Sequence, residues 1–173
     1  MWSVSAGRAW PRTDVRRHRP DAGRAPKWAS VLEREHPETP LYPADSIEFA
    51  RALFLEEYAD TLVREATAPF FYENTIKRLF MGKSPDDTVL QEASSLRDEC
   101  FEYLEGCVDD DFLVGDSLSV ADIALGAQIV TFQQGDQTID KKRWPKFARY
   151  IETMLSRPSF SALIDEEAAS LSR

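Results

Sequence analysis

Apolar residues recur every three or four positions along most of residues 44–173, which is the spacing of amphipathic α-helices. The stretch from about Ile47 to Thr67 predicts a helix, with Asp45 or Ser46 as its N-cap. Pro69 is expected to break or kink it. We expect the apolar stripe of this helix to consist of Ala50, Leu53, Phe54, Tyr58 and Leu62.

A further helical segment is predicted from Phe70 to Phe80, ending at Gly82, with Pro85 just beyond it. The most regular pattern follows, from about Asp86 to Cys107. It places one set of residues on a single face of a helix: Val89, Ala93, Leu96, Cys100, Tyr103 and Cys107.

The two cysteines of the chain, Cys100 and Cys107, both lie in this helix. They are two turns apart, or about 10 Å along the axis, which is too far for a disulfide. We interpret them as small core residues and not as a redox pair.

A strong helix-start signal occurs at Ser119. Its side chain and that of Asp122 have the spacing of a capping box, and Leu118 and Ile123 have the spacing of a hydrophobic staple. The sequence from Val120 to Phe132 has no charge after Asp122, which predicts a central buried helix.

Another amphipathic helix is predicted from Trp144 to Leu155, and a last short helix after Pro158. Trp28 to Glu35 reads as a short helix, and the proline-rich segment "HPETPLYPADS" reads as a linker. Residues 44–173 contain no strand-like alternation. The sequence therefore predicts an all-α bundle of about six helices.

Composition and charge narrow the function. The 173 residues are 43% hydrophobic and 29% charged, as in a globular protein. The net charge of −9 is uneven: residues 1–27 carry seven Arg and Lys against two Asp, and the remaining residues carry −14. An acidic body repels nucleic acids and anionic membranes, so a small molecule or another protein is the expected partner.

The basic segment 1–27 contains three prolines and shows no helical or strand period, so we expect a disordered tail. A transit peptide or a nucleic-acid-binding arm are the alternatives, and a misassigned start would produce the same segment. No apolar run could cross a membrane or serve as a signal peptide, so the expected location is the cytoplasm.

A metal site is not expected, because the chain has only two histidines, His18 and His36, beside its two cysteines. The acidic run from Asp109 to Asp111 lacks the alternating ligands and closing Glu of a calcium loop. We interpret it as a solvated helix end.

The segments "FLVGDSLSVADIAL" (residues 112–125) and "RWPKFARYIETMLSRPSF" (residues 143–160) resemble the C-terminal domain of the soluble glutathione S-transferases. The family's buried sixth helix begins with a capping box and a staple, to which Ser119, Asp122, Leu118 and Ile123 are similar. The "RP" turn before the last helix also looks similar. The resemblance extends from about residue 30 to residue 170.

The resemblance implies that glutathione, reacting as a thiolate, conjugates or reduces a small electrophile, and that the protein is a homodimer. In the family a thioredoxin-like N-terminal domain supplies the catalytic residue. About 43 residues precede the helical body here, and no such residue is recognisable. We therefore expect residues 1–27 as a tail, 28–43 as a remnant of the first domain and linker, and 44–173 as the helical domain, with the catalytic half truncated.

The helical body could still hold the apolar substrate. The candidate contacts are Phe54, Tyr58, Phe71 and Tyr72, and ordinary core or interface packing is the alternative for these rings. A second reading of the whole chain is a non-catalytic dimerisation or binding module built on the same fold.

Overall fold

A computed structural model describes residues 28–108 and 111–171. The expectations for segment 1–27 and for Asp109 and Asp110 lie outside these residues. The chain divides after Pro37 into two units. In the first, α1 (Trp28–Glu35) is the short helix that the sequence predicts.

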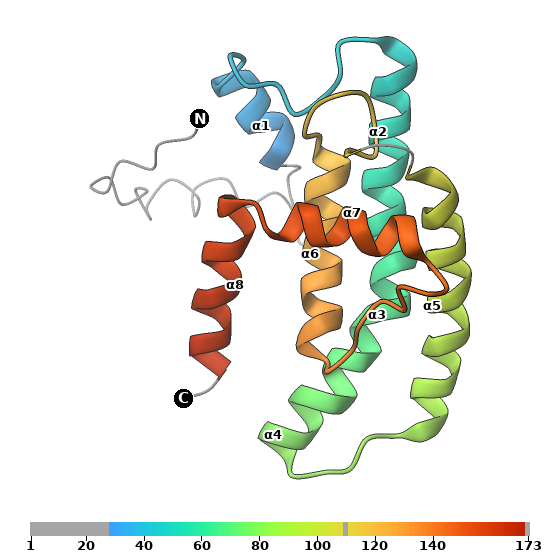
Figure 1. Cartoon of the computed structure of the whole chain (residues 1–173). Coiled ribbons are helices and arrows are strands. Elements are labelled where there is room, and N and C mark those ends of the chain that lie inside the picture. The colour runs from blue at the N-terminus through green and yellow to red at the C-terminus, as the bar shows by residue number, and fades with distance from the viewer. Residues whose placement is uncertain (1–27, 109–110, 172–173) are drawn as a thin grey trace, which may run out of the picture. The chain divides into compact units, whose positions relative to one another are not determined.

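The second unit is built from helices only, which confirms the predicted fold class for the described residues (Figure 1). An unbroken helical run occupies its first part, and four separate helices follow. The run comprises α2 (Ser46–Tyr58), the π-helical turn η1 (Ala59–Val63), α3 (Arg64–Phe71), a second π-helical turn η2 (Tyr72–Ile76) and α4 (Lys77–Met81). The separate helices are α5 (Asp87–Cys107), α6 (Val120–Gln134), α7 (Pro145–Leu155) and α8 (Pro158–Leu171).

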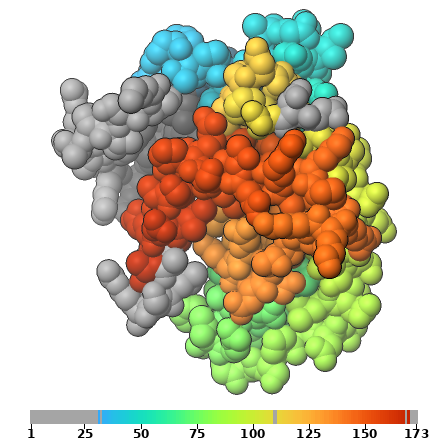
Figure 2. Space-filling view, viewed as in Figure 1, coloured from blue at the N-terminus to red at the C-terminus, as the bar shows by residue number. Residues whose placement is uncertain are grey.

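Helix α6 is the central element, as its uncharged sequence predicts. It contacts α2, η1, α3 and α7, and eight of its residues are buried. Figure 2 shows α7 lying across part of α6. One flank of α6 is exposed to solvent, and Ile123 on this flank is 36% exposed.

Aromatic rings fill the space where α3, α5, α6 and α7 meet. Phe101 of α5 lies at the centre of this group, with its ring 5.5 Å from Phe132 and 5.0 Å from Phe147. Phe70 packs edge-on against Phe132, and Trp144 packs edge-on against Phe101.

The predicted apolar stripe of the first long helix is wrong in part, because Leu53 and Tyr58 are half-buried but Ala50 is exposed. Phe54 and Leu62 are exposed, whereas the buried face consists of Ala52, Leu55, Ala59, Val63, Ala66 and Phe70. These residues also repeat every three or four positions, and three of them are alanines. Small side chains allow the backbones of neighbouring helices to approach closely, so this face buries three alanines while Phe54 lies on the outer face.

The predicted face of α5 is correct only in part. Ala93 and Cys100 are buried as expected, but Val89 and Tyr103 are 37% and 43% exposed. Phe101 and Leu104 are buried in their place. The helix has 21 residues, and a strict repeat of seven drifts around an α-helix of 3.6 residues per turn. Both cysteines are free thiols.

The break expected at Pro69 does not occur, because α3 continues to Phe71. Asp45 caps α2 by accepting hydrogen bonds from the backbone N–H groups of Ile47 and Glu48. The expected end at Gly82 is confirmed, and its φ of 59° is the left-handed conformation that favours glycine.

Two glycines allow close contacts around α6. A Cβ atom at Gly126 would lie 2.6 Å from the Cζ atom of Phe160, so α8 packs directly over this residue. A Cβ atom at Gly135, just past α6, would lie 2.7 Å from the backbone of Phe70 and Phe71. Nearby, Asn74 and Thr75 of η2 donate hydrogen bonds to carbonyls at the end of α6.

Candidate functional site

Three aromatic side chains gather on the outer side of α2 and α5, and we call them the aromatic cluster: Phe54, Tyr58 and Tyr103. The rings of Tyr58 and Tyr103 are 4.8 Å apart, and the Phe54 ring lies 6.0 Å from Tyr58 and 6.4 Å from Tyr103. Phe54 is 53% exposed and Tyr103 is 43% exposed. The cluster therefore presents apolar rings to solvent.

Each tyrosine of the cluster interacts with a cysteine, which affects its pKa. Burial and a hydrogen bond donated to Cys100 raise the pKa of Tyr58 far above its ordinary value of 10.0. Burial and a hydrogen bond with Cys107 raise the pKa of Tyr103. Both phenols are therefore neutral at physiological pH.

Cys100 is not an activated nucleophile. Burial raises the pKa of its thiol, as do the negative charges of Glu99 and Glu65. A thiol needs a lowered pKa to react as a thiolate near neutral pH. The aromatic cluster can thus hold an apolar ring, but these groups do not supply an ionised nucleophile.

A groove of about 700 Å³ lies along α3, and we call it the acidic groove. Its lining residues are Asp60, Thr61, Arg64, Glu65, Ala68, Pro69, Tyr72, Glu73 and Val89. Tyr72 is 48% exposed, and its hydroxyl lies 3.8 Å from the sulfur of Met81. Asp60 of this lining follows Tyr58 of the aromatic cluster by two residues in the same helical run.

Of the four proposed substrate contacts, Phe54 and Tyr58 lie together in the aromatic cluster. Tyr72 lines the acidic groove. Phe71 is half-buried and is not part of the groove lining. Their role in binding stays a prediction. Sequence reasoning missed Tyr103, because it assigned this residue to the buried face of α5.

Ser119 and Asp122 form the capping box at the start of α6. The fully buried Asp122 carboxylate does more than cap the helix. One oxygen accepts from the backbone N–H and the hydroxyl of Ser119, both at 2.8 Å. The other accepts from the Leu113 N–H at 2.9 Å and from the Tyr150 hydroxyl at 2.7 Å. A single carboxylate therefore joins the loop before α6, α6 itself and α7.

The proximity of Asp122 also affects Tyr150. Burial, followed by the negative charge of Asp122 and their hydrogen bond, raises the pKa of this tyrosine strongly. Leu118 packs against the core, while Ile123 is 36% exposed. The staple between these two residues stays a prediction.

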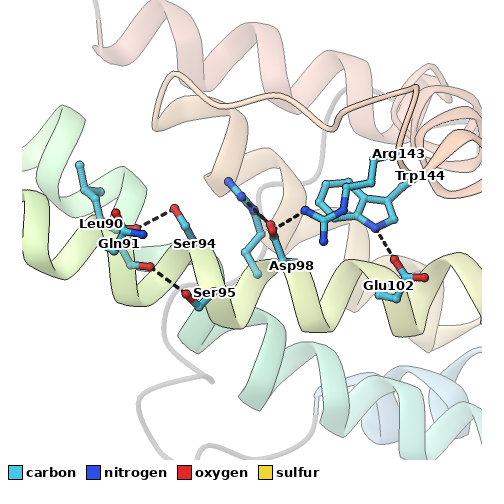
Figure 3. Close-up of polar contacts among 9 residues, drawn as sticks. Leu90, Gln91, Ser94, Ser95, Asp98, Glu102, Arg143 and Trp144 are labelled. Carbon is cyan, nitrogen blue, oxygen red and sulfur yellow. Dashed lines mark hydrogen bonds and ion pairs between the residues drawn. The ribbon is translucent and has the colours of Figure 1, made fainter.

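Acidic residues of α5 fix the start of α7 (Figure 3). The Trp144 ring nitrogen donates to Glu102 at 3.1 Å, and Arg143 pairs with Asp98. Arg97 and Arg143 together hold the pKa of Asp98 below its ordinary value, against the effect of burial. This arrangement is structural, because all its polar groups are paired with one another.

Two negative findings apply to the described part of the chain. No group of three or more His, Cys, Asp or Glu residues there is arranged to hold a metal ion. No described helix has the length and hydropathy needed to cross a membrane.

The chain resembles a known protein family and several solved structures. The family model for "Glutathione S-transferase, C-terminal domain" matches residues 59–158. No curated protein sequence matches the chain.

Several solved structures share the fold. One from Rhodospirillum rubrum F11, described as a glutathione S-transferase, has a TM-score of 0.69 at 24% identity, covering 77% of this chain and 60% of that one. FzlA from C. crescentus has a TM-score of 0.68 at 25% identity, with coverages of 76% and 58%.

A third similar structure is a glutathione S-transferase from Methylobacterium radiotolerans in complex with glutathione sulfonate. Its TM-score is 0.59 at 25% identity, and the match covers 77% of this chain and 61% of that one. The chain thus spans about three fifths of the length of these proteins.

Proposed function

Because the chain belongs to the glutathione S-transferase family, we propose that it serves glutathione-dependent conjugation or reduction of small electrophiles, with the helical domain holding the electrophile. The observation that carries this proposal is the aromatic cluster, in which Phe54 and Tyr103 expose their rings to solvent. Converging aromatic rings provide apolar surface against which a small apolar molecule can pack. The cytoplasm remains the proposed location.

Glutathione is the proposed co-substrate. Support comes from the Methylobacterium radiotolerans structure, which contains glutathione sulfonate. The described residues suggest a division of labour, because both cluster phenols and Cys100 are held neutral and none of them is placed to ionise the glutathione thiol. We assign binding of the electrophile to this domain and no thiol activation to the aromatic cluster.

Binding of the neutral dye Nile red tests the electrophile-holding role. We expect fluorescence enhancement that saturates, and Phe54→Ala or Tyr103→Ala should weaken binding about three- to tenfold, the range for a lost ring contact. Leu163→Ala is the matched control, because it removes a 59% exposed apolar side chain from α8. Equal binding by all four proteins would contradict the proposal.

Retention on immobilised glutathione tests the co-substrate separately. Elution by free glutathione is the expected result, and passage through the column without retention would leave glutathione without support. Dye binding and glutathione retention therefore report on the two halves of the proposal independently.

A non-catalytic dimerisation or binding module is the second candidate function. The same exposed rings favour it, because large exposed apolar groups also mark protein interfaces. Sedimentation equilibrium distinguishes the two roles. A dimer that dissociates on Phe54→Ala, in a protein that does not bind Nile red, would favour the module.

A further inference from the structure

The last turn of the helical run exposes three apolar side chains, which we call the apolar tip: Leu79, Phe80 and Met81. Phe80 is 70% exposed, which is more than any ring of the aromatic cluster, and its two neighbours are 55% and 47% exposed. Figure 1 shows α4 at the end of the unit, where the chain turns toward α5. Exposed apolar patches on a single chain often mark interaction sites.

The apolar tip lies next to the acidic groove. Tyr72 lines the groove, and its hydroxyl lies 3.8 Å from the sulfur of Met81 in the tip. The groove has a volume of about 700 Å³, and its lining includes the apolar groups of Ala68, Pro69 and Val89. Cavities of this size hold whole small molecules, so a single phenylalanine ring fits. One surface therefore carries both an exposed ring and a hollow that can receive one.

The tip differs in charge from the rest of the chain. The seven residues from Lys77 to Lys83 include three basic residues and no acidic one, although the whole chain carries −9. Lys77 pairs with the buried Glu73, and Arg78 pairs with Asp136 at the surface. Lys83 is exposed at the end of the tip. Two copies of an acidic chain repel one another, and this repulsion is reduced where basic residues gather.

The groove has the opposite balance of charge. The carboxylates of Asp60 and Glu65 line it, with the guanidinium of Arg64. Glu65 precedes Ala68 and Pro69 by three and four positions within α3, so the three residues lie on one side of this helix. An exposed carboxylate thus stands beside the apolar wall. The tip of one copy and the groove of another complement each other in shape and in charge.

This arrangement fits a twofold contact, in which the same patch on both copies must be complementary to itself. Because tip and groove are neighbours, each of two copies can place its tip in the groove of the other. The tip and Tyr72 expose about 400 Å² per copy, judged from the area of aromatic side chains. With the groove walls, two copies bury about 1,000 Å², which is the lower limit of a specific interface.

We propose that the chain self-associates through the apolar tip, with Phe80 of each copy seated in the acidic groove of the other and Lys83 facing Glu65 across the contact. The area at the lower limit of specific interfaces makes this a weak, reversible dimer. The inference goes beyond the proposed function, because it concerns a surface other than the aromatic cluster.

Sedimentation velocity of the full chain over a concentration series tests the proposal. We expect a reversible monomer–dimer equilibrium that Phe80→Ala weakens at least about tenfold, as for an aromatic side chain at the centre of an interface. Leu163→Ala removes an apolar side chain of similar exposure from α8 and should leave the equilibrium unchanged. Phe54→Ala should also leave it unchanged. Circular dichroism checks that the variants keep their helices.

A charge exchange tests the pairing of tip and groove. Lys83→Glu and Glu65→Lys should each dissociate the dimer, because like charges then meet in both contacts. Mixed with each other, the two variants should associate, because each tip again faces the opposite charge. Asp165→Lys reverses an exposed carboxylate of α8 and should not associate with Lys83→Glu. Energy transfer between differently labelled variants measures the mixed dimer.

Several results would overturn the inference. A chain that stays monomeric throughout the series shows that the tip does not bind a second copy, and leaves the dye-binding test of the proposed function unaffected. A dimer that survives Phe80→Ala, or charge variants that do not associate when mixed, would also contradict it. A dimer lost on Phe54→Ala alone would place the contact at the aromatic cluster. A monomer that binds lipid vesicles through Phe80 would assign the tip to a membrane surface instead.

Discussion

At the scale of single residues, several buried groups depend on the side chain of Asp122 for a hydrogen-bond partner. Its carboxylate accepts four hydrogen bonds from Leu113, Ser119 and Tyr150, and it has no exposed surface. Removing it leaves several buried donors unpaired at once. The consequence should therefore exceed the loss of an ordinary helix cap.

We expect Asp122→Ala to lower the free energy of unfolding by about 3–5 kcal/mol, since each unpaired buried donor costs about 1–3 kcal/mol. Ser119→Ala is the comparison, with an expected loss of about 1 kcal/mol for a missing cap. Urea unfolding followed by circular dichroism measures both. Equal losses in the two variants would show that Leu113 and Tyr150 do not depend on the carboxylate.

Glu73 should make stability depend on pH. Its hydrogen bond with Lys77, assisted by the Asp86 N–H, lowers the pKa of this carboxyl below its ordinary value of 4.5. Above pH 4.5 the group is ionised in both folded and unfolded chains, so its stabilising effect is fully present. As the pH falls below that value, the unfolded chain takes up the proton first and the effect is lost.

The test compares the wild type with Glu73→Gln between about pH 7 and about pH 3. The wild type should be the more stable protein at neutral pH, and the difference should shrink steadily on acidification. Lys77→Met should remove most of this pH dependence, because the lysine is the main cause of the lowered pKa. A constant difference across the range would contradict this account.

At the scale of elements, two glycines predict contrasting costs. A Cβ atom at Gly135 would collide with the backbone of Phe70 and Phe71, which cannot rotate away. At Gly126 it would meet only the far end of the Phe160 side chain. We therefore expect Gly135→Ala to cost about 2–3 kcal/mol and Gly126→Ala about 1 kcal/mol or less.

Thermal unfolding of the two variants provides the comparison, and Phe160→Ala serves as the control. Combined with Phe160→Ala, the Gly126→Ala substitution should cost little more than Phe160→Ala alone, because the colliding ring is gone. A larger cost at Gly126 than at Gly135 would mean that α8 is held more rigidly than the backbone around Phe70.

The same elements show how far sequence reasoning extends. The helix ends at Asp45, Ser119 and Gly82 were predictable, because these residues have local preferences that do not depend on distant residues. Which face of each helix is buried was less predictable. In the run from α2 through η1 to α3 the buried residues include Ala52, Ala59 and Ala66, and hydrophobicity alone ranks these below Phe54 and Leu62.

The candidate site was predictable only in part for a related reason. Phe54, Tyr58 and Tyr72 can be selected from the sequence as aromatic residues of one helical run. Tyr103 enters the site through the pairing of this run with α5, which no local pattern indicates. The role of all these residues awaits the binding experiments above.

At the scale of the whole unit from residue 38 to 171, stability should be uneven. Helix α6 has eight buried residues, while the described side chains of α8 include none that are fully buried. Elements with few buried side chains open locally, without unfolding the rest. We therefore expect amide hydrogens of α8 to exchange much faster than those of α6.

Hydrogen exchange followed by mass spectrometry checks this order. Phe160→Ala should accelerate exchange in α8 further and leave α6 unchanged, since Phe160 packs over Gly126. Leu163→Ala removes an exposed side chain of the same helix and should have little effect. Equal protection of α6 and α8 would indicate that the unit opens only as a whole.

The π-helical turns on either side of Pro69 have a consequence for how related sequences are compared. A π turn closes through i→i+5 hydrogen bonds and so holds one residue more than an α turn. One residue corresponds to about 100° of rotation about a helix axis. A homologue with a single-residue deletion between positions 59 and 63 would close an ordinary α turn there and present the same side of the following helix at Tyr72. A one-residue alignment gap at that point is therefore compatible with an unchanged helix face, and residues beyond it should still be equated one for one.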